Sequence, residues 1–137
     1  MKDCINNAIC GICMLVTGVT GLCPVSARAA CADEPAPGVN WTGCDKQGID
    51  LSGKDLSSAV FTRANLDNAD FSGSRLTHAD LNLASLKNVT FDKARMIGAR
   101  LIGVKAGGAS FSKAVLDDAS LSRSELNTAD FTGARLR

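Results

Sequence analysis

The sequence predicts an all-β fold, a narrow coil of short extended segments, and three observations support this prediction. First, 45% of the 137 residues are hydrophobic but only 4% are aromatic, so Ala and Leu must form the interior. Second, a five-residue repeat runs without a slip from Ile49 to the C-terminus. Third, four Phe residues are spaced by 20 positions. A repeat that cannot bury its apolar face alone predicts a solenoid.

The five-residue repeat places two inward residues in each block. Every fifth residue from Leu51 to Leu136 gives eighteen positions, which hold eleven Leu, five Phe, Met96 and Ala106. Two residues earlier in each block, twelve of the eighteen positions are Ala. On a helix the large residues would wander around the axis, and on a flat strand they would alternate faces. We therefore expect each block to be a short extended piece followed by a corner, where Gly is frequent.

The phenylalanine spacing indicates the number of corners in one turn of the coil. Four of the five rings are 20 residues apart, namely Phe71, Phe91, Phe111 and Phe131. Twenty residues make four blocks, so a turn has four sides and these rings should stack along one of them. Adjacent coils are expected about 4.8 Å apart.

Several blocks follow the pattern A-[DN]-[LF]-x-x, among them Ala64–Asn68, Ala69–Gly73, Ala79–Leu83 and Ala129–Gly133. In these blocks the sequence resembles the pentapeptide-repeat family over about two-thirds of the chain. The resemblance implies a right-handed quadrilateral β-helix over residues 49–137, with four repeats per coil and about four to five coils. The motif is specific for the fold and says little about function.

Residues 1–29 are expected to be a signal peptide rather than part of the fold. Lys2 precedes an apolar run over residues 8–25, and residues 27–29 (Ala-Arg-Ala) fit a signal peptidase site. The alternative is a retained membrane anchor, although three Gly residues and Pro24 weaken a spanning helix. Cleavage would give a periplasmic or secreted bacterial protein with no membrane attachment.

Residues 30–48 are expected to form a linker and an N-terminal cap. Cleavage would leave Cys31 and Cys44 as a pair, for which a disulfide is expected in an oxidising compartment. Trp41 should cover the first coil. The last coil has no equivalent cover after Leu136, so its open edge favours a homo-oligomer. The alternative is fraying of the last block, with Arg135 and Arg137 blunting the edge.

The chemistry expected of an enzyme is missing from the sequence. His78 is the single histidine, and it falls in an outward corner slot without a second base nearby. The pair Asp117–Asp118 is more typical of a solvated turn than of an acid and base. We expect no catalytic residues, no metal and no cofactor. The formal net charge of +1 also argues against a nucleic-acid partner.

One surface patch is a candidate partner-binding site. Apolar residues fall in outward or corner slots beside basic ones, and the patch comprises Leu83, Arg95, Ile97, Arg100, Ile102 and Lys105. The alternative is scattered surface residues whose charges pair between coils as Asp80–Arg100 and Lys105–Glu125.

The sequence thus favours an exported, non-catalytic structural or protein-interaction module with an unidentified protein partner. The family resemblance implies an alternative, a cytosolic DNA mimic that binds topoisomerases and protects them from quinolones. DNA mimicry needs a continuous acidic face, whereas the repeat region holds twelve Lys/Arg against ten Asp/Glu. Export would also separate the protein from topoisomerase.

Overall fold

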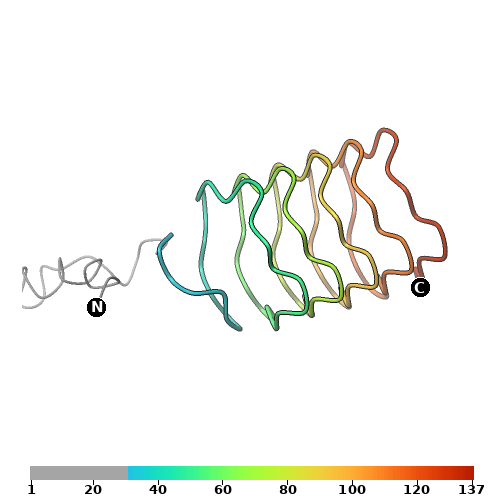
Figure 1. The fold of residues 1–137 in the computed structure, drawn as a ribbon. Helices are drawn as coiled ribbons and strands as arrows, with labels where there is room; N and C mark the ends of the chain where they lie inside the picture. Colours follow the sequence, from blue (N-terminus) through green and yellow to red (C-terminus); the bar gives the residue numbers. More distant parts are fainter. Residues whose placement is uncertain (1–30) are drawn as a thin grey trace, which may run out of the picture.

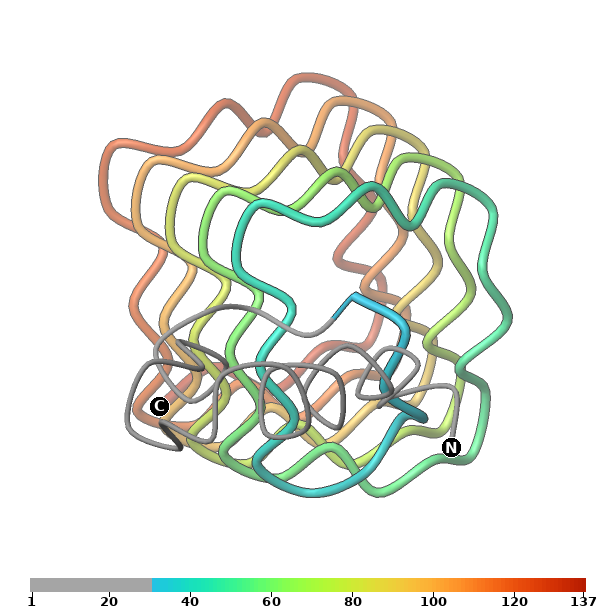
Figure 2. The same cartoon turned by 90° about the vertical axis from the view of Figure 1, so that its left-hand side faces the viewer.

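The computed structural model describes residues 31–137 as one coil that winds along a single axis (Figure 1). These residues contain no helix and no strand longer than one residue. Their β structure consists of single-residue parallel bridges, each joining a residue to the one 20 positions later, from Asn40↔Val60 to Val115↔Arg135. One turn therefore takes twenty residues and has four sides, as the view along the axis shows (Figure 2). This confirms the four-block turn.

Each corner is a tight turn with a positive φ at its second corner residue. The N–H of the next small residue usually closes it, as where Ala64 donates to the carbonyl of Phe61 at 2.9 Å. Glycine takes this conformation without strain, as at Gly53 (φ 65°). Eleven non-glycine residues within residues 31–137 also take this conformation, Leu83 (φ 62°) among them. All corners therefore share one backbone conformation, whereas the residue type at this position varies.

The interior is filled by the stacked inward residues. The rings of Phe71, Phe91 and Phe111 follow one another at 5.0 Å, and Phe131 follows Phe111 at 4.8 Å. The predicted aromatic stack is therefore confirmed. Phe61 lies on the opposite side and meets Phe71 edge-on at 5.9 Å across the core.

The N-terminal end is covered. Trp41 is fully buried, packs on Phe61 at 5.7 Å, and has the Lys46 ammonium 4.1 Å from its ring centroid. Cys31 and Cys44 are joined by a disulfide with their Cα atoms 5.6 Å apart. The bridges begin at Asn40, so the coil starts nine residues before Ile49 and the cap is also part of the first coil.

The C-terminal end is more open. Inward residues between Leu51 and Leu116 are almost all buried, whereas those from Ala119 onward are only partly so, and Leu136 is 53% exposed. Within residues 31–137, no helix is long and apolar enough to cross a membrane. The expected signal peptide and its anchor alternative lie outside the described residues.

Candidate binding surfaces

The outward residues form four columns that run along the coil, one on each side. Side 1 carries Asn40, Val60, Asp80, Arg100 and Ser120. Side 2 carries Asp45, Asn65, Ser85, Lys105 and Glu125. Side 3 carries Asp50, Asp70, Thr90, Ser110 and Asp130. Side 4 carries Asp55, Arg75, Arg95, Val115 and Arg135.

Charge is unevenly shared between two adjacent sides. The side 3 column has three Asp and no cation, whereas the side 4 column has three Arg and one Asp. Arg75 and Arg95 bridge directly, and so do Asp50 and Asp70. The net charge of +1 is therefore close to neutral although the coil carries one acidic and one basic column.

The structure distributes the predicted patch around a single coil. Arg95 lies on side 4, Arg100 on side 1 and Lys105 on side 2. Ile97 lies at the corner between sides 4 and 1, and Ile102 at the corner between sides 1 and 2. Residues ten apart along a four-sided coil lie on opposite sides. The three cations therefore point in different directions.

Leu83 and Ile102 do lie together, at the corner between sides 1 and 2. The Leu83 N–H donates to the Ile102 carbonyl at 2.9 Å, and the Ile102 N–H donates to Oδ1 of Asn82 at 2.9 Å. Leu83 is 52% exposed and leans over Gly103, where an added Cβ would lie 2.8 Å from its Cδ2. We call Leu83, Ile102 and the adjacent Arg100 the apolar corner.

Three ion pairs join neighbouring coils within residues 31–137, and the arginine of each is exposed. Arg100 lies 3.7 Å from Asp80, as predicted, and Arg75 lies 3.9 Å from Asp55. Lys105 and Glu125 bridge through their backbones, but their side chains do not come within ion-pair distance. Such exposed pairs contribute little to stability.

The three residues weighed for catalysis, His78, Asp117 and Asp118, lie at one corner, between sides 4 and 1. The ring of His78 lies over Gly98, and Asp117 pairs with Arg135. Hydrogen bonding and the charge of Arg135 lower the pKa of Asp117. Among residues 31–137, no three His, Cys, Asp or Glu side chains gather into a metal-binding group.

The pentapeptide-repeat family model matches residues 42–77, 69–105 and 99–137, with eight copies. The chain belongs to the pentapeptide-repeat family. Its members form right-handed quadrilateral β-helices, and the four-sided turn of twenty residues in this chain fits that architecture.

Solved pentapeptide-repeat structures are similar to this chain. HetL from the cyanobacterium Nostoc sp. Strain PCC 7120, involved in heterocyst differentiation regulation, is 29% identical with a TM-score of 0.69. The match covers 72% of this chain and 47% of HetL, so the chain spans about half the length of that protein. A pentapeptide-repeat protein from the Arabidopsis thaliana thylakoid lumen is 31% identical, with 71% of each chain covered and a TM-score of 0.41.

The plasmid-mediated fluoroquinolone resistance protein QnrB1 is 20% identical with a TM-score of 0.37, over 73% of this chain and 76% of that one. This likeness concerns the fold alone. None of the curated protein sequences compared with this pentapeptide-repeat chain matches it.

The charged columns were not predicted from the sequence, although the sequence contains the pattern that indicates them. The family pattern places Asp or Asn in the outward slot, and side 4 departs from it at Arg75, Arg95, Val115 and Arg135. Reading the outward slot at intervals of twenty residues, rather than five, separates the columns and reveals the departure.

Proposed function

We propose that this pentapeptide-repeat protein is an exported, non-catalytic module that binds a protein partner through the apolar corner. The observation that supports this is Leu83. A bulky residue at positive φ is unfavourable because its Cβ crowds the following carbonyl. Leu83 takes φ 62° and still leaves half of its side chain exposed, so folding gains little from its apolar surface.

The neighbours of Leu83 favour a contact surface at this corner. Gly103 leaves the space into which Leu83 leans, and half-buried Ile102 extends the apolar area on the same corner. Arg100 supplies an exposed cation on the adjoining side. An apolar centre with a polar rim is the arrangement found at protein interfaces.

A pair of matched variants tests the binding surface. Ile97→Asp/Ile102→Asp places one carboxylate in the apolar corner, at position 102, and one at the neighbouring corner, at position 97. It should abolish capture of the partner while the circular dichroism spectrum is unchanged. Gln47→Asp/Asn127→Asp makes the same charge change in the same turn slot at the corner between sides 2 and 3. This control should retain capture. Capture by the first variant, or loss with both, would rule the apolar corner out.

Export is supported by the disulfide, since such bonds persist in oxidising compartments. Fractionation with N-terminal sequencing tests it: we expect a mature N-terminus at Ala30 in the cell envelope or medium. Thiol counting on that material should find Cys31 and Cys44 oxidised. An intact Met1 terminus on cytosolic protein would contradict export.

The alternative function is a cytosolic DNA mimic that binds topoisomerase. The acidic column of side 3 is the surface that would serve it, but Thr90 and Ser110 interrupt it and side 4 beside it is basic. We expect no effect on gyrase supercoiling at micromolar protein. Inhibition that is lost in Asp50→Asn/Asp70→Asn would favour the mimic over the interaction module.

We also propose that a second copy covers the last coil. Its inward residues are only partly buried and Leu136 is exposed, whereas Trp41 and the disulfide cover the opposite end. Pairing of two equivalent open ends closes as a dimer rather than a fibre. Analytical ultracentrifugation should show a dimer that Leu136→Lys dissociates. A monomer across the whole concentration range would contradict this.

A further inference from the structure

Side 4 and its corner with side 3 carry a continuous basic stripe that the proposed protein contact does not use. Its members are the cations of four successive coils, namely Arg75, Lys93, Arg95, Lys113 and Arg135. All five are exposed. Three coil steps separate Arg75 from Arg135, which gives a stripe about 15 Å long.

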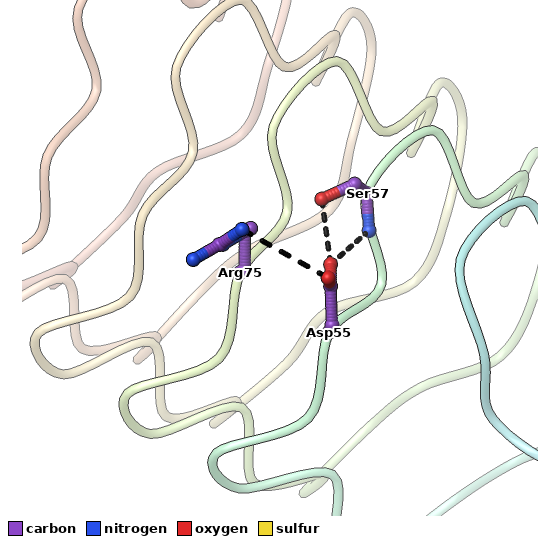
Figure 3. A network of polar contacts seen from close by, with 3 residues as sticks. All are labelled: Asp55, Ser57 and Arg75. Carbon is purple, nitrogen blue, oxygen red and sulfur yellow. Dashed lines mark hydrogen bonds and ion pairs between the residues drawn. The ribbon is translucent and has the colours of Figure 1, made fainter.

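The middle of the stripe is not neutralised by the protein itself. Asp55 pairs with Arg75 and also accepts hydrogen bonds from Ser57 (Figure 3), and Asp117 pairs with Arg135. Asp92 instead accepts a hydrogen bond from the Ser110 hydroxyl. Among residues 31–137, no ion pair within 4 Å involves the other three cations, Lys93, Arg95 and Lys113.

Stacking these cations works against folding. Arg75 bridges Arg95 directly, and Lys93 lies one coil before Lys113 at the adjoining corner. Coils are 4.8 to 5.0 Å apart along the aromatic stack. Like charges directly opposite each other in a sheet destabilise it. An anion that lies across neighbouring coils would remove this repulsion.

We infer that the basic stripe binds a linear anionic polysaccharide lying along the coil axis. Guanidinium groups bind sulfate and carboxylate oxygens in paired hydrogen bonds, and lysines add charge along the line. Because the cations repeat at the coil spacing, successive anionic substituents of one polymer chain meet successive coils.

The shape of the stripe favours a line of charge over a plane. Asp92 and the side 3 column border it on one edge, and Asp117 and Asp118 border it on the other. A flat anionic membrane surface would also press on these carboxylates. A single polymer chain lying along the stripe would meet fewer of them.

Two other linear partners fit less well. Nucleic acid strands gain much of their affinity from stacking on exposed aromatic rings, whereas the rings of this coil lie in its interior. A peptide that adds to a sheet needs free backbone N–H and carbonyl groups. The backbone groups of the stripe are already paired between coils, since the N–H groups of Arg75, Arg95 and Arg135 donate to carbonyls one coil earlier at 2.8 to 2.9 Å.

Calorimetry with a heparin octasaccharide tests the inference, with the full chain and a matched pair of variants. Lys93→Glu/Lys113→Glu reverses two corner residues of the stripe. Arg63→Glu/Arg123→Glu reverses two at the corner between sides 1 and 2, with the same positive φ (58° to 59° at all four positions). We expect the first pair to weaken binding about tenfold or more and to reduce the salt dependence, and the second to change it little.

Equal loss of heparin binding with both pairs of variants would mean that binding depends only on the overall charge of the protein, and it would overturn the inference. Absence of heparin binding at low salt would overturn it as well. Tighter binding of phosphatidylglycerol vesicles, oligothymidylate or polyglutamate than of heparin would overturn the polysaccharide as the occupant. If the charge reversals unfold the protein, Lys93→Gln/Lys113→Gln and Arg63→Gln/Arg123→Gln replace them. This inference does not rest on the apolar corner, which Ile97→Asp/Ile102→Asp tests separately.

Discussion

The Ser124 hydroxyl accepts a hydrogen bond from the backbone N–H of Val104, one coil earlier, at 3.3 Å, and donates to the Leu101 carbonyl at 2.5 Å. The turn over residues 101–104 lacks the direct N–H to carbonyl bond that closes its neighbours. Ser124 thus supplies the missing closure from the next coil. Ser74 occupies the same inward slot two and a half coils earlier, but its buried hydroxyl has no partner.

These two serines should respond in opposite ways to alanine. Ser124→Ala should lower the free energy of unfolding by about 1 kcal/mol, because two buried backbone groups lose their partner. Ser74→Ala should leave it unchanged or raise it, because an unpaired hydroxyl is removed. Urea denaturation measures both. Equal losses would show that Ser124 closes nothing.

The aromatic stack should dominate the stability of the coil. Phe91 lies between Phe71 and Phe111 at 5.0 Å from each and is fully buried. Phe91→Ala should cost about 3 to 5 kcal/mol, since it removes a large side chain and leaves a cavity. Met96→Leu, at the next large inward position, is close to volume-conserving and should cost less than about 1.5 kcal/mol.

Denaturation curves compare the two variants directly. A loss for Phe91→Ala as small as that for Met96→Leu would mean that the ring does not pack as the structure places it.

The glycine corners differ in how much space they have. Gly53 and Gly98 share a φ of 65°, but a Cβ at Gly53 meets nothing within 4 Å, whereas a Cβ at Gly98 lies 2.5 Å from Nδ1 of His78. Gly53→Ala should therefore cost about 1 kcal/mol for its backbone alone. Gly98→Ala should cost about 1 kcal/mol more.

A double-mutant cycle isolates the contact between the two coils. His78→Ala should restore most of the extra loss in Gly98→Ala and none of the loss in Gly53→Ala. Thermal unfolding of the five variants gives the coupling energy. No coupling between positions 78 and 98 would refute the contact.

Acid should destabilise the coil through its outward aspartates. Hydrogen bonds from the Ser57 hydroxyl and N–H lower the pKa of Asp55, with a smaller effect of the Arg75 charge. Hydrogen bonds from Ser52 and from Thr132 lower the pKa of Asp50 and of Asp130 in the same way. An aspartate whose pKa is lower in the folded state stabilises that state at pH values above its pKa in the unfolded chain, which is about 3.9. That stability is lost as the pH falls through the folded values.

An NMR titration of the Asp55 carboxyl group tests this origin. Ser57→Ala should raise the pKa of Asp55 toward its ordinary value and reduce the fall in Tm between pH 5 and pH 2 (about the range in which aspartates titrate). Ser112→Ala is the control, because Ser110 rather than an aspartate precedes it by two residues. A titration of Asp55 that is unchanged in Ser57→Ala would exclude the serine as the cause.

The sequence predicted the parts of the fold that repeat and missed those that depend on neighbouring coils. The twenty-residue phenylalanine spacing placed Phe91 and Phe111 correctly in one stack, because inward residues one full turn apart lie above one another. It did not predict Lys46 over Trp41, since a lysine in an inward slot breaks the pattern. Nor did it predict Ser124 closing another coil's turn.

The candidate surface shows the same limit. Arg95 and Lys105 are close in sequence, but the four-sided turn places them on opposite sides. Leu83 and Ile102 are nineteen residues apart and adjoin. The phenylalanine spacing already indicates a twenty-residue turn, and that turn brings Leu83 and Ile102 together. The same four-sided turn separates Arg95, Arg100 and Lys105, which the sequence analysis grouped in one patch.

The central claim is that the apolar corner is where a protein partner binds, and site-specific crosslinking in the producing cells tests it most directly. A photoreactive residue at Ile102 should yield a crosslinked partner of one defined size. The same residue at Asn127, in the same turn slot on another corner, should yield none, and Leu83→Asp should abolish the product at position 102. No product at position 102, or the same product at both positions, would contradict the account.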